Sequence, residues 1–178
     1  VIHRGAIVLT SNDDPDVVRV IRNRALKFGN PFHLVDAAHR TPLPGAFQER
    51  NVALAVRAAQ ELRAMLPRIT PASIERGVAE TRWRGRLERF EIAGKEIWVD
   101  GGHNAHAAEV IAPFIASKIA PPRLLVFGIM GDKDVAAVAR ELFPLFDEVI
   151  ATEPFPPRSA GAGQLADMAR AAGLPASA

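Results

Sequence analysis

Residues 97–104 read Ile-Trp-Val-Asp-Gly-Gly-His-Asn (IWVDGGHN), an apolar run that ends in a charged residue and two glycines. The apolar run predicts a buried strand and the segment from Asn104 onward predicts a helix, so Asp100 lies at a strand tip. Paired glycines let the backbone turn sharply and approach a ligand, and free amides at a helix start favour an anion. Asp100 can accept hydrogen bonds from ribose hydroxyls, position a cation or only cap the helix, a task for which Asn104 is better placed.

The chain continues from this stretch as an alternation of short apolar runs and amphipathic segments. This rhythm predicts an α/β, Rossmann-like fold with a mostly parallel sheet, helices on both faces and ligands bound beyond the carboxyl ends of the strands. Pro113 is expected to kink the first of these helices or to move its start, because proline lacks an amide hydrogen. The predicted strands are 97–100, 124–128 and 149–152, and the predicted helices are about 104–118, 133–143 and 163–172.

The residues before this alternation predict a βαβ unit, a linker, two helices and a β-hairpin. The linker, residues 39–45 (HRTPLPG), holds prolines and a glycine that oppose regular structure, so we expect a domain boundary there. The expected domains are residues 1–45 and residues 46–178. The βαβ unit is predicted at 6–10, 14–28 and 32–35, the helices at 48–66 and after the cap Thr70, and the hairpin at 86–92 and 96–100.

The composition is that of an ordinary globular protein: 178 residues, 48% hydrophobic, 24% charged, with a net charge of +2. Basic and acidic residues alternate, which indicates a solvated surface and argues against nucleic-acid binding. The sequence contains no cysteine, which excludes disulfides, thiolate metal sites and thiol nucleophiles. No run approaches about 18 uninterrupted apolar residues, the length that suggests a membrane span. We therefore expect a cytoplasmic protein with neither a nucleic acid nor a membrane as partner. We also expect a monomer, although the sequence does not itself give the oligomeric state.

Charged residues gather at further strand ends. Residues 131–134 (Gly-Asp-Lys-Asp) follow the second predicted strand and form either a site wall or, through an aspartate, only a helix cap. Arg158 follows the third strand and can pair with a carboxylate or phosphate. Arg86, just before the hairpin, can reach a phosphate or lie on the surface. His103 and His106 share a helix face, but no third ligand is evident, so we expect no metal site in this chain.

Taken in order, these motifs resemble the folylpolyglutamate synthase/dihydrofolate synthase family, relatives of the Mur ligases. The matching motifs, which span nearly the whole chain, are Gln48-x-x-Asn51, Trp83-x-Gly85-Arg86-Leu87-Glu88, Asp100-Gly-x-His103-Asn104-x-His106-Ala107, Gly131-Asp132-Lys133-Asp134, and Thr152 through Pro157-Arg158-Ser159. The resemblance implies an ATP-dependent ligase with a P-loop ATPase domain followed by a smaller Rossmann-like domain. ATP would phosphorylate a carboxylate of a folate or dihydropteroate substrate, and the amine of L-glutamate would attack the acyl phosphate to form an amide.

The resemblance also implies roles for individual residues, and some departures from the family pattern limit them. The chain has no Gly-x-x-x-x-Gly-Lys-Ser/Thr loop, so residues 1–45 are expected to be only the tail of the ATPase domain, and the Mg²⁺ ligands are expected in the rest of that domain. Two other possibilities stay open, a non-catalytic Rossmann-like nucleotide-binding module and a Mur-type peptidoglycan ligase domain. The implied ATP-binding residues are Asn51, Arg86, Asp100, Gly101 and Asn104; the catalytic ones are His103 and Lys133; and the substrate-binding ones are His103, Arg158 and Ser159.

Overall fold

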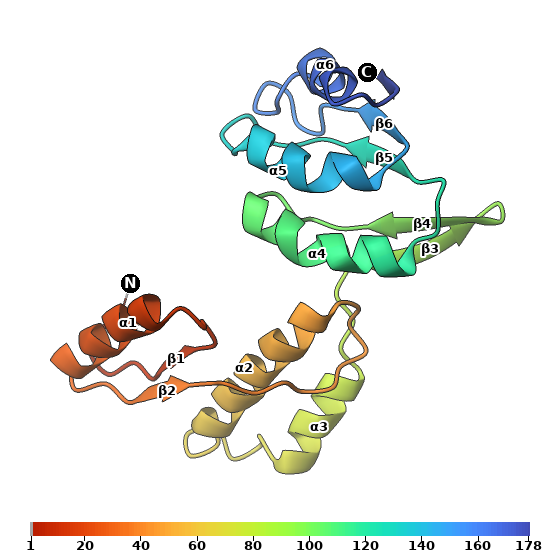
Figure 1. Ribbon diagram of the computed structural model, residues 1–178. Helices are drawn as coiled ribbons and strands as arrows, with labels where there is room; N and C mark the ends of the chain where they lie inside the picture. Colours follow the sequence, from red (N-terminus) through yellow and green to blue (C-terminus); the bar gives the residue numbers. More distant parts are fainter. Residues whose placement is uncertain (1) are drawn as a thin grey trace. The chain divides into compact units, whose positions relative to one another are not determined.

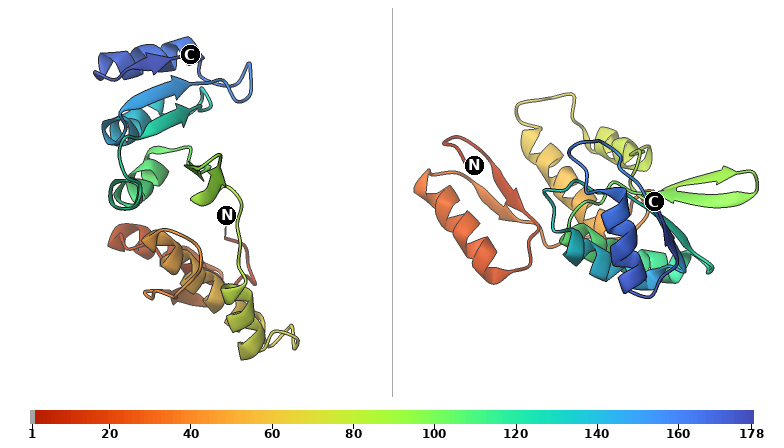
Figure 2. Two further views of the ribbon diagram at one scale, coloured as in Figure 1. Left: turned by 90° about the vertical axis from the view of Figure 1, so that its right-hand side faces the viewer. Right: turned by 90° about the horizontal axis from the view of Figure 1, so that it is seen from above.

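The computed structural model describes residues 2–178, and the chain forms two compact units, 1–99 and 100–178 (Figures 1 and 2). The predicted α/β class is confirmed, with a mostly parallel arrangement of strands and one antiparallel hairpin. The predicted domain boundary near residue 45 falls inside the first unit and stays a prediction. Within residues 2–178, no helix is long and apolar enough to cross a membrane.

The unit 1–99 begins with the predicted βαβ arrangement, in which β1 (Val8–Thr10) and β2 (Phe32–Leu34) pair in parallel. Asp14 caps the intervening helix α1 (Pro15–Lys27) by accepting from the amide of Asp16 at 2.8 Å. Proline at the first helical position suits this start, because the amide that proline lacks would have no helical partner there. No helix or strand is formed between Leu34 and Ala46, as predicted for the linker.

Two helices and the hairpin complete this unit. α2 (Ala46–Leu62) lies against β1, and α3 (Pro71–Ala79) starts at the predicted cap Thr70, whose side chain and that of Ser73 exchange hydrogen bonds with each other's backbone amides. The antiparallel hairpin of β3 (Glu88–Ile92) and β4 (Lys95–Val99) turns where Ala93 and Gly94 both have positive φ. The second predicted helix was expected to reach residue 66, but α2 ends at Leu62.

The unit 100–178 is built around the three-stranded parallel sheet β5-β6-β7. The segment 97–100 was predicted both as the second strand of the hairpin and as the first strand of the parallel sheet. The hairpin is confirmed, since β4 pairs antiparallel with β3 among the described strands, and the assignment to the parallel sheet was wrong. The helix α4 begins at Ala105 and runs through Pro113, so the proline does not move the start of the helix, and a kink at Pro113 stays a prediction. The elements of this unit are α4 (Ala105–Lys118), β5 (Leu124–Phe127), α5 (Val135–Leu142), the 3₁₀ turn η1 (Phe143–Leu145), β6 (Glu148–Ala151), α6 (Ala162–Ala171) and β7 (Ala176–Ser177).

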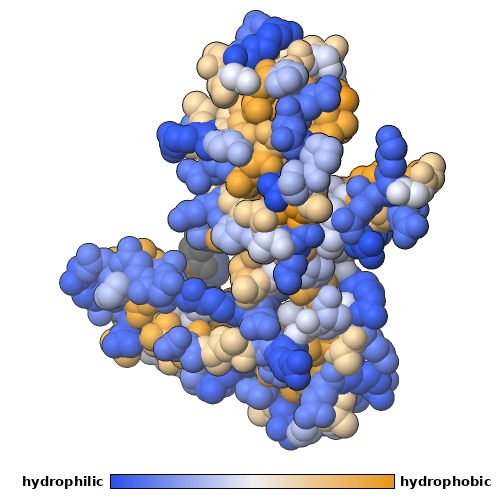
Figure 3. All heavy atoms as spheres, turned by 45° about the vertical axis from the view of Figure 1, so that its right-hand side comes forward, coloured by the Kyte–Doolittle hydropathy of each residue, from blue (hydrophilic) through white to orange (hydrophobic). Residues whose placement is uncertain are grey.

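One face of this sheet packs on helices and forms the core of the unit. Val149 of β6 and Leu165 of α6 are completely buried, and Val138 of α5 is 1% exposed. On β5, Phe127 is buried, whereas Leu124 and Val126 are 52% and 64% exposed, as expected when successive side chains point to opposite faces. Figure 3 shows apolar side chains on the surface of this unit, at the top of the view. The loops at the carboxyl ends of β5 and β6 are thus held by a well-packed core.

Candidate functional site

The turn between β4 and α4 is shaped by its own side chains. Asp100 Oδ1 accepts a hydrogen bond from the amide of Gly102 at 2.7 Å, and Asn104 Oδ1 accepts from the amide of Ala107 at 2.8 Å. Asn104 therefore caps α4, and Asp100 stabilises the turn before it. His103 is exposed, and its Nδ1 lies 3.0 Å from the carbonyl oxygen of Gly101. With a hydrogen on Nδ1 donated to that carbonyl, Nε2 is the ring atom left to meet a ligand.

Glycine is well suited to position 102 because the turn is tight. A Cβ there would lie 3.0 Å from Asp100 Oδ1 and 3.3 Å from the Cβ of Ala107. Gly101 and Gly102 have no side chains of their own to block a ligand from the start of α4, but the amide of Gly102 already donates to Asp100 Oδ1. The use of this turn as a binding loop stays a prediction, and the side chain of Asn104 is already engaged in capping.

The loops that follow β5 and β6 are joined by backbone hydrogen bonds. The amide of Gly131 donates to the carbonyl of Arg158 at 2.8 Å, and the amide of Ala160 donates to the carbonyl of Ile129 at 2.9 Å. Met130 and Ser159 form an antiparallel bridge between them. The two predicted clusters, residues 131–134 and residues 157–159, therefore lie side by side at the carboxyl ends of neighbouring parallel strands.

Side chains on this loop pair differ in their availability to a ligand. The side chain of Lys133 is 34% exposed and its Nζ lies 3.3 Å from Asp132 Oδ2, whereas Asp134 caps α5 by accepting from the amide of Ala137 at 3.0 Å. Arg158 is exposed, while Ser159 Oγ accepts a hydrogen bond from the amide of Phe155 at 2.9 Å. Lys133 and Arg158 are thus the cations that this loop pair can offer to an anion.

Gly128 at the end of β5 lets these loops approach each other. A Cβ at this position would lie 2.6 Å from Cδ of Pro154 and 2.9 Å from the carbonyl oxygen of Thr152. Both distances are shorter than van der Waals contact, so a side chain here would push the two loops apart. The glycine that ends the predicted strand is a packing requirement of the site.

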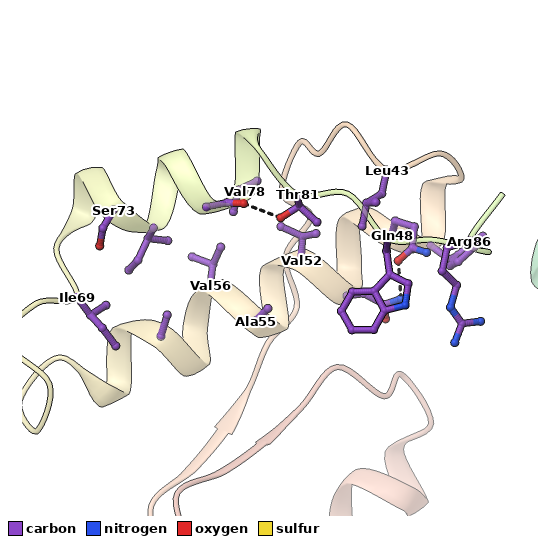
Figure 4. Close-up of a pocket in the computed structure, with 16 residues that line it drawn as sticks. Leu43, Gln48, Val52, Ala55, Val56, Ile69, Ser73, Val78, Thr81 and Arg86 are labelled. Atoms are coloured by element: carbon purple, nitrogen blue, oxygen red, sulfur yellow. Dashed lines mark hydrogen bonds between the residues drawn. The ribbon is translucent and has the colours of Figure 1, made fainter. Parts of the chain in front are cut away.

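A cavity of about 730 Å³ lies between α2 and α3 within residues 1–99, and its polar end holds Asn51 and Arg86 (Figure 4). Gln48, 6% exposed, accepts a hydrogen bond at Oε1 from Nδ2 of Asn51 at 3.0 Å. In Figure 4 the guanidinium of Arg86 points away from the two helices, at the same end as Gln48. The apolar wall is formed by side chains of both helices, including Val52, Ala55, Val56, Ala59, Ile74 and Val78.

The turn that carries Arg86 has an unusual backbone. Gly85 and Leu87, on either side of Arg86, have φ of 65° and 47°. Residues other than glycine rarely adopt this left-handed region of the backbone. Leu87 is held there because its side chain is 2% exposed, and the carboxylate of Glu88 accepts from the amide of Gly85 at 2.7 Å. Backbone strain of this kind persists where surrounding structure over-determines it, and it is concentrated at functional sites.

The predicted site residues therefore fall into groups. Asn51 and Arg86 share one cavity in the unit 1–99, Asp100 to Asn104 form one turn, and Lys133 and Arg158 lie on one loop pair. The sequence analysis did not single out the α2–α3 cavity, the contact of Glu88 with the Arg86 turn, or Glu153, whose contact is described below. In the part of the chain described, no three His, Asp or Glu side chains are close enough to hold a metal ion.

Comparison with known proteins gives a consistent result. Residues 85–178 match the family model described as Mur ligase, glutamate ligase domain. The chain is 27% identical to the folylpolyglutamate synthase of Lacticaseibacillus casei, over 84% of this chain and 41% of that protein. It is 26% identical to the dihydrofolate synthase/folylpolyglutamate synthase of Bacillus subtilis, over 80% of this chain and 39% of that protein. The chain thus spans about two fifths of the length of these relatives.

Solved structures agree with the fold. The folylpolyglutamate synthase of Mycobacterium tuberculosis complexed with ADP superimposes with a TM-score of 0.81 over 96% of this chain and 44% of that one, at 22% identity. The ligand-free bifunctional folylpolyglutamate synthase/dihydrofolate synthase of Yersinia pestis gives a TM-score of 0.70 at 26% identity, over 93% of this chain and 43% of that one.

Proposed function

Because the chain belongs to the Mur ligase family through the glutamate ligase domain, we propose that it is part of an ATP-dependent ligase that adds L-glutamate to a folate or dihydropteroate. The strongest support is the match of residues 85–178 to the glutamate ligase domain. The folylpolyglutamate and dihydrofolate synthases that resemble the chain over most of its length favour a folate substrate over a peptidoglycan precursor. We also propose that the whole enzyme is a cytoplasmic monomer.

In the proposed reaction, ATP phosphorylates a carboxylate of the folate substrate and ADP leaves. The amine of L-glutamate then attacks the acyl phosphate, so that a C–N bond forms, the C–O bond to phosphate breaks, and the amine loses a proton. Magnesium would accompany ATP, but the described residues provide no cluster to hold it, so we assign its ligands to the ATPase domain outside this chain. A structure of a bifunctional folylpolyglutamate synthase/dihydrofolate synthase contains Mn, AMPPNP and L-glutamate, which supports a metal–nucleotide complex.

The geometry supports distinct roles for the groups of residues. Arg86, exposed on its strained turn, would offset phosphate charge as that charge shifts in the transition state. Asn51 would contact the nucleotide at the polar end of the α2–α3 cavity, and Asp100 would contact the ribose from the turn that also includes Gly101. For Asn104 we propose an indirect part, because its side chain caps α4.

The remaining residues would act on L-glutamate. Arg158 is exposed on the loop after β6 and would pair with a carboxylate of the amino acid, a geometry that the planar guanidinium favours. Lys133 lies on the adjoining loop and would stabilise the acyl phosphate, and His103 would hold or move a proton at the attacking amine. Ser159 would act through the loop, since its hydroxyl already accepts from the amide of Phe155.

The proposal is tested with the full-length protein that contains this chain, by measuring ATP-dependent joining of radiolabelled L-glutamate to dihydropteroate and to tetrahydrofolate. Arg86→Ala is expected to lower kcat about a hundredfold, as expected when a group that stabilises transition-state charge is removed. Arg84→Ala, an exposed arginine two residues away, is the matched control and should retain activity. A full-length protein that binds ATP but joins glutamate to neither substrate would contradict the proposed function.

A further inference from the structure

Glu153, in the loop after β6, closes that loop onto the start of α6. Its Oε1 accepts a hydrogen bond from the amide of Ala162, the first residue of α6, at 2.9 Å. The N-cap residue of this helix is Gly161, which has no side chain to supply such an acceptor. A carboxylate at a helix start satisfies an unpaired amide and is attracted by the helix dipole. Glu153 thus serves as the missing cap from nine residues away.

The same loop is also held by backbone hydrogen bonds to the loop that follows β5. The carbonyl of Arg158 and the amide of Ala160 bond to residues 131 and 129 of the neighbouring loop, at 2.8 and 2.9 Å. Within the same loop, the amide of Phe155 donates to Ser159 Oγ. The backbone of Arg158 is therefore fixed from both sides while the side chain itself is exposed.

From these contacts we infer that Glu153 is a positioning residue for Arg158, which sets where the guanidinium meets the carboxylate of L-glutamate. This inference rests on the proposed function, in which Arg158 binds that carboxylate. A bidentate arginine–carboxylate pair depends on fixed geometry, because each added degree of freedom must be lost again on binding.

Two variants separate the geometric role of Glu153 from its charge. Glu153→Ala removes the acceptor, and residues 153–162 should then exchange amide hydrogens faster in this chain. Glu153→Gln keeps an acceptor oxygen at the same place, and it should preserve the protection of those amides. Glu148→Ala, at an exposed position on β6 of the same unit, is the matched control and should leave exchange in the loop unchanged. Unchanged exchange in Glu153→Ala would overturn the inference.

In the full-length enzyme, Glu153→Ala should raise the KM for L-glutamate about tenfold while kcat and the KM for ATP change less than about twofold. Glu153→Gln should stay near wild type in all of these. If Glu153→Ala leaves the KM for L-glutamate unchanged, or alters all kinetic constants alike, Glu153 does not position Arg158. If the unmutated full-length enzyme joins no glutamate, the proposed function itself fails, and the exchange measurement still decides whether Glu153 holds the loop.

Discussion

Two aspartates at the start of α5 lie two residues apart but make different contacts. Asp134 accepts a hydrogen bond from the amide of Ala137, whereas Asp132 is exposed and lies near Lys133 Nζ. We predict that Asp134→Ala lowers the free energy of unfolding of the unit 100–178 by about 1 kcal/mol, the usual cost of losing a helix cap. Asp132→Ala should change it by less than about 0.5 kcal/mol, because surface ion pairs contribute little. Urea unfolding followed by circular dichroism would measure both, and equal effects would contradict the capping role.

The sequence could predict where the site residues fall but not what each side chain does. Asp100, Lys133 and Arg158 follow apolar runs, and the carboxyl end of a strand is where ligands bind in such folds. Hydrogen bonds between residues far apart in sequence carry no local signal, so the contact of Glu153 with Ala162 was not predictable. The side chain of Asn104 caps α4, as its position before a helix suggests, and its part in cofactor binding stays a prediction.

At the scale of elements, the hairpin β3–β4 carries an ion pair between Arg89 and Glu96. Hydrogen bonds from the Arg89 side chain and then from that of Trp98 lower the pKa of the Glu96 carboxyl below its usual value. A lowered folded-state pKa means that this stabilisation is present above the unfolded pKa and is lost as the pH falls through the folded one. We predict that the hairpin loosens as the pH falls below the usual pKa of a glutamate and through the lowered pKa of Glu96, seen as a change in Trp98 fluorescence in a Trp83→Phe background.

The matched variants for this titration are Glu96→Gln and Glu75→Gln. Glu96→Gln should abolish the acid-induced change in Trp98 fluorescence, because the group that titrates is gone. Glu75→Gln, which alters an exposed glutamate of α3, should leave it in place. An acid transition that persists unchanged in Glu96→Gln would assign it to another group.

Alanine substitutions at two glycines of the unit 1–99 should change its stability in opposite directions. Gly77 lies within α3, and Gly85 lies in the turn at Arg86. A Cβ added to either glycine would meet no atom within 4 Å. Of the two, only Gly85 has a positive φ, of 65°. Gly77→Ala should therefore stabilise the unit by about 0.5–1 kcal/mol through helix propensity. Gly85→Ala should destabilise it by about 1–2 kcal/mol through left-handed strain. Thermal unfolding of both variants gives the signs, and stabilisation by Gly85→Ala would show that the strained turn is not required.

Sequence patterns located most elements, and the misses have physical reasons. The cap Thr70 with Pro71 and the turn at residues 93–94 are local signals, and both were found where expected. Pro113 does not interrupt α4 because it and Glu109, whose carbonyl loses its helical partner, lie at exposed positions where water can hydrogen-bond that carbonyl. The segment 97–100 pairs across the turn at residues 93–94 as the predicted hairpin requires, whereas the residue pattern alone did not exclude its place in the parallel sheet.

At the scale of the whole molecule, each unit has its own buried core, so a core substitution in one should leave the stability of the other unchanged. Leu165, completely buried, belongs to the unit 100–178, and Val52, 8% exposed, belongs to the unit 1–99. Leu165→Ala should cost about 2–5 kcal/mol in the first, and Val52→Ala about 1–2 kcal/mol in the second.

The positions of the tryptophans make this prediction measurable. The chain has two, Trp83 and Trp98, both in the unit 1–99, so their fluorescence reports that unit while far-ultraviolet circular dichroism reports the helices of both. In urea, Leu165→Ala should move part of the dichroism transition to lower concentration and leave the fluorescence midpoint in place, because Leu165 belongs to the unit 100–178 and both indoles belong to the unit 1–99. Val52→Ala should move the fluorescence midpoint instead. If either variant shifts both signals equally, the two cores unfold as one cooperative unit and the predicted independence is wrong.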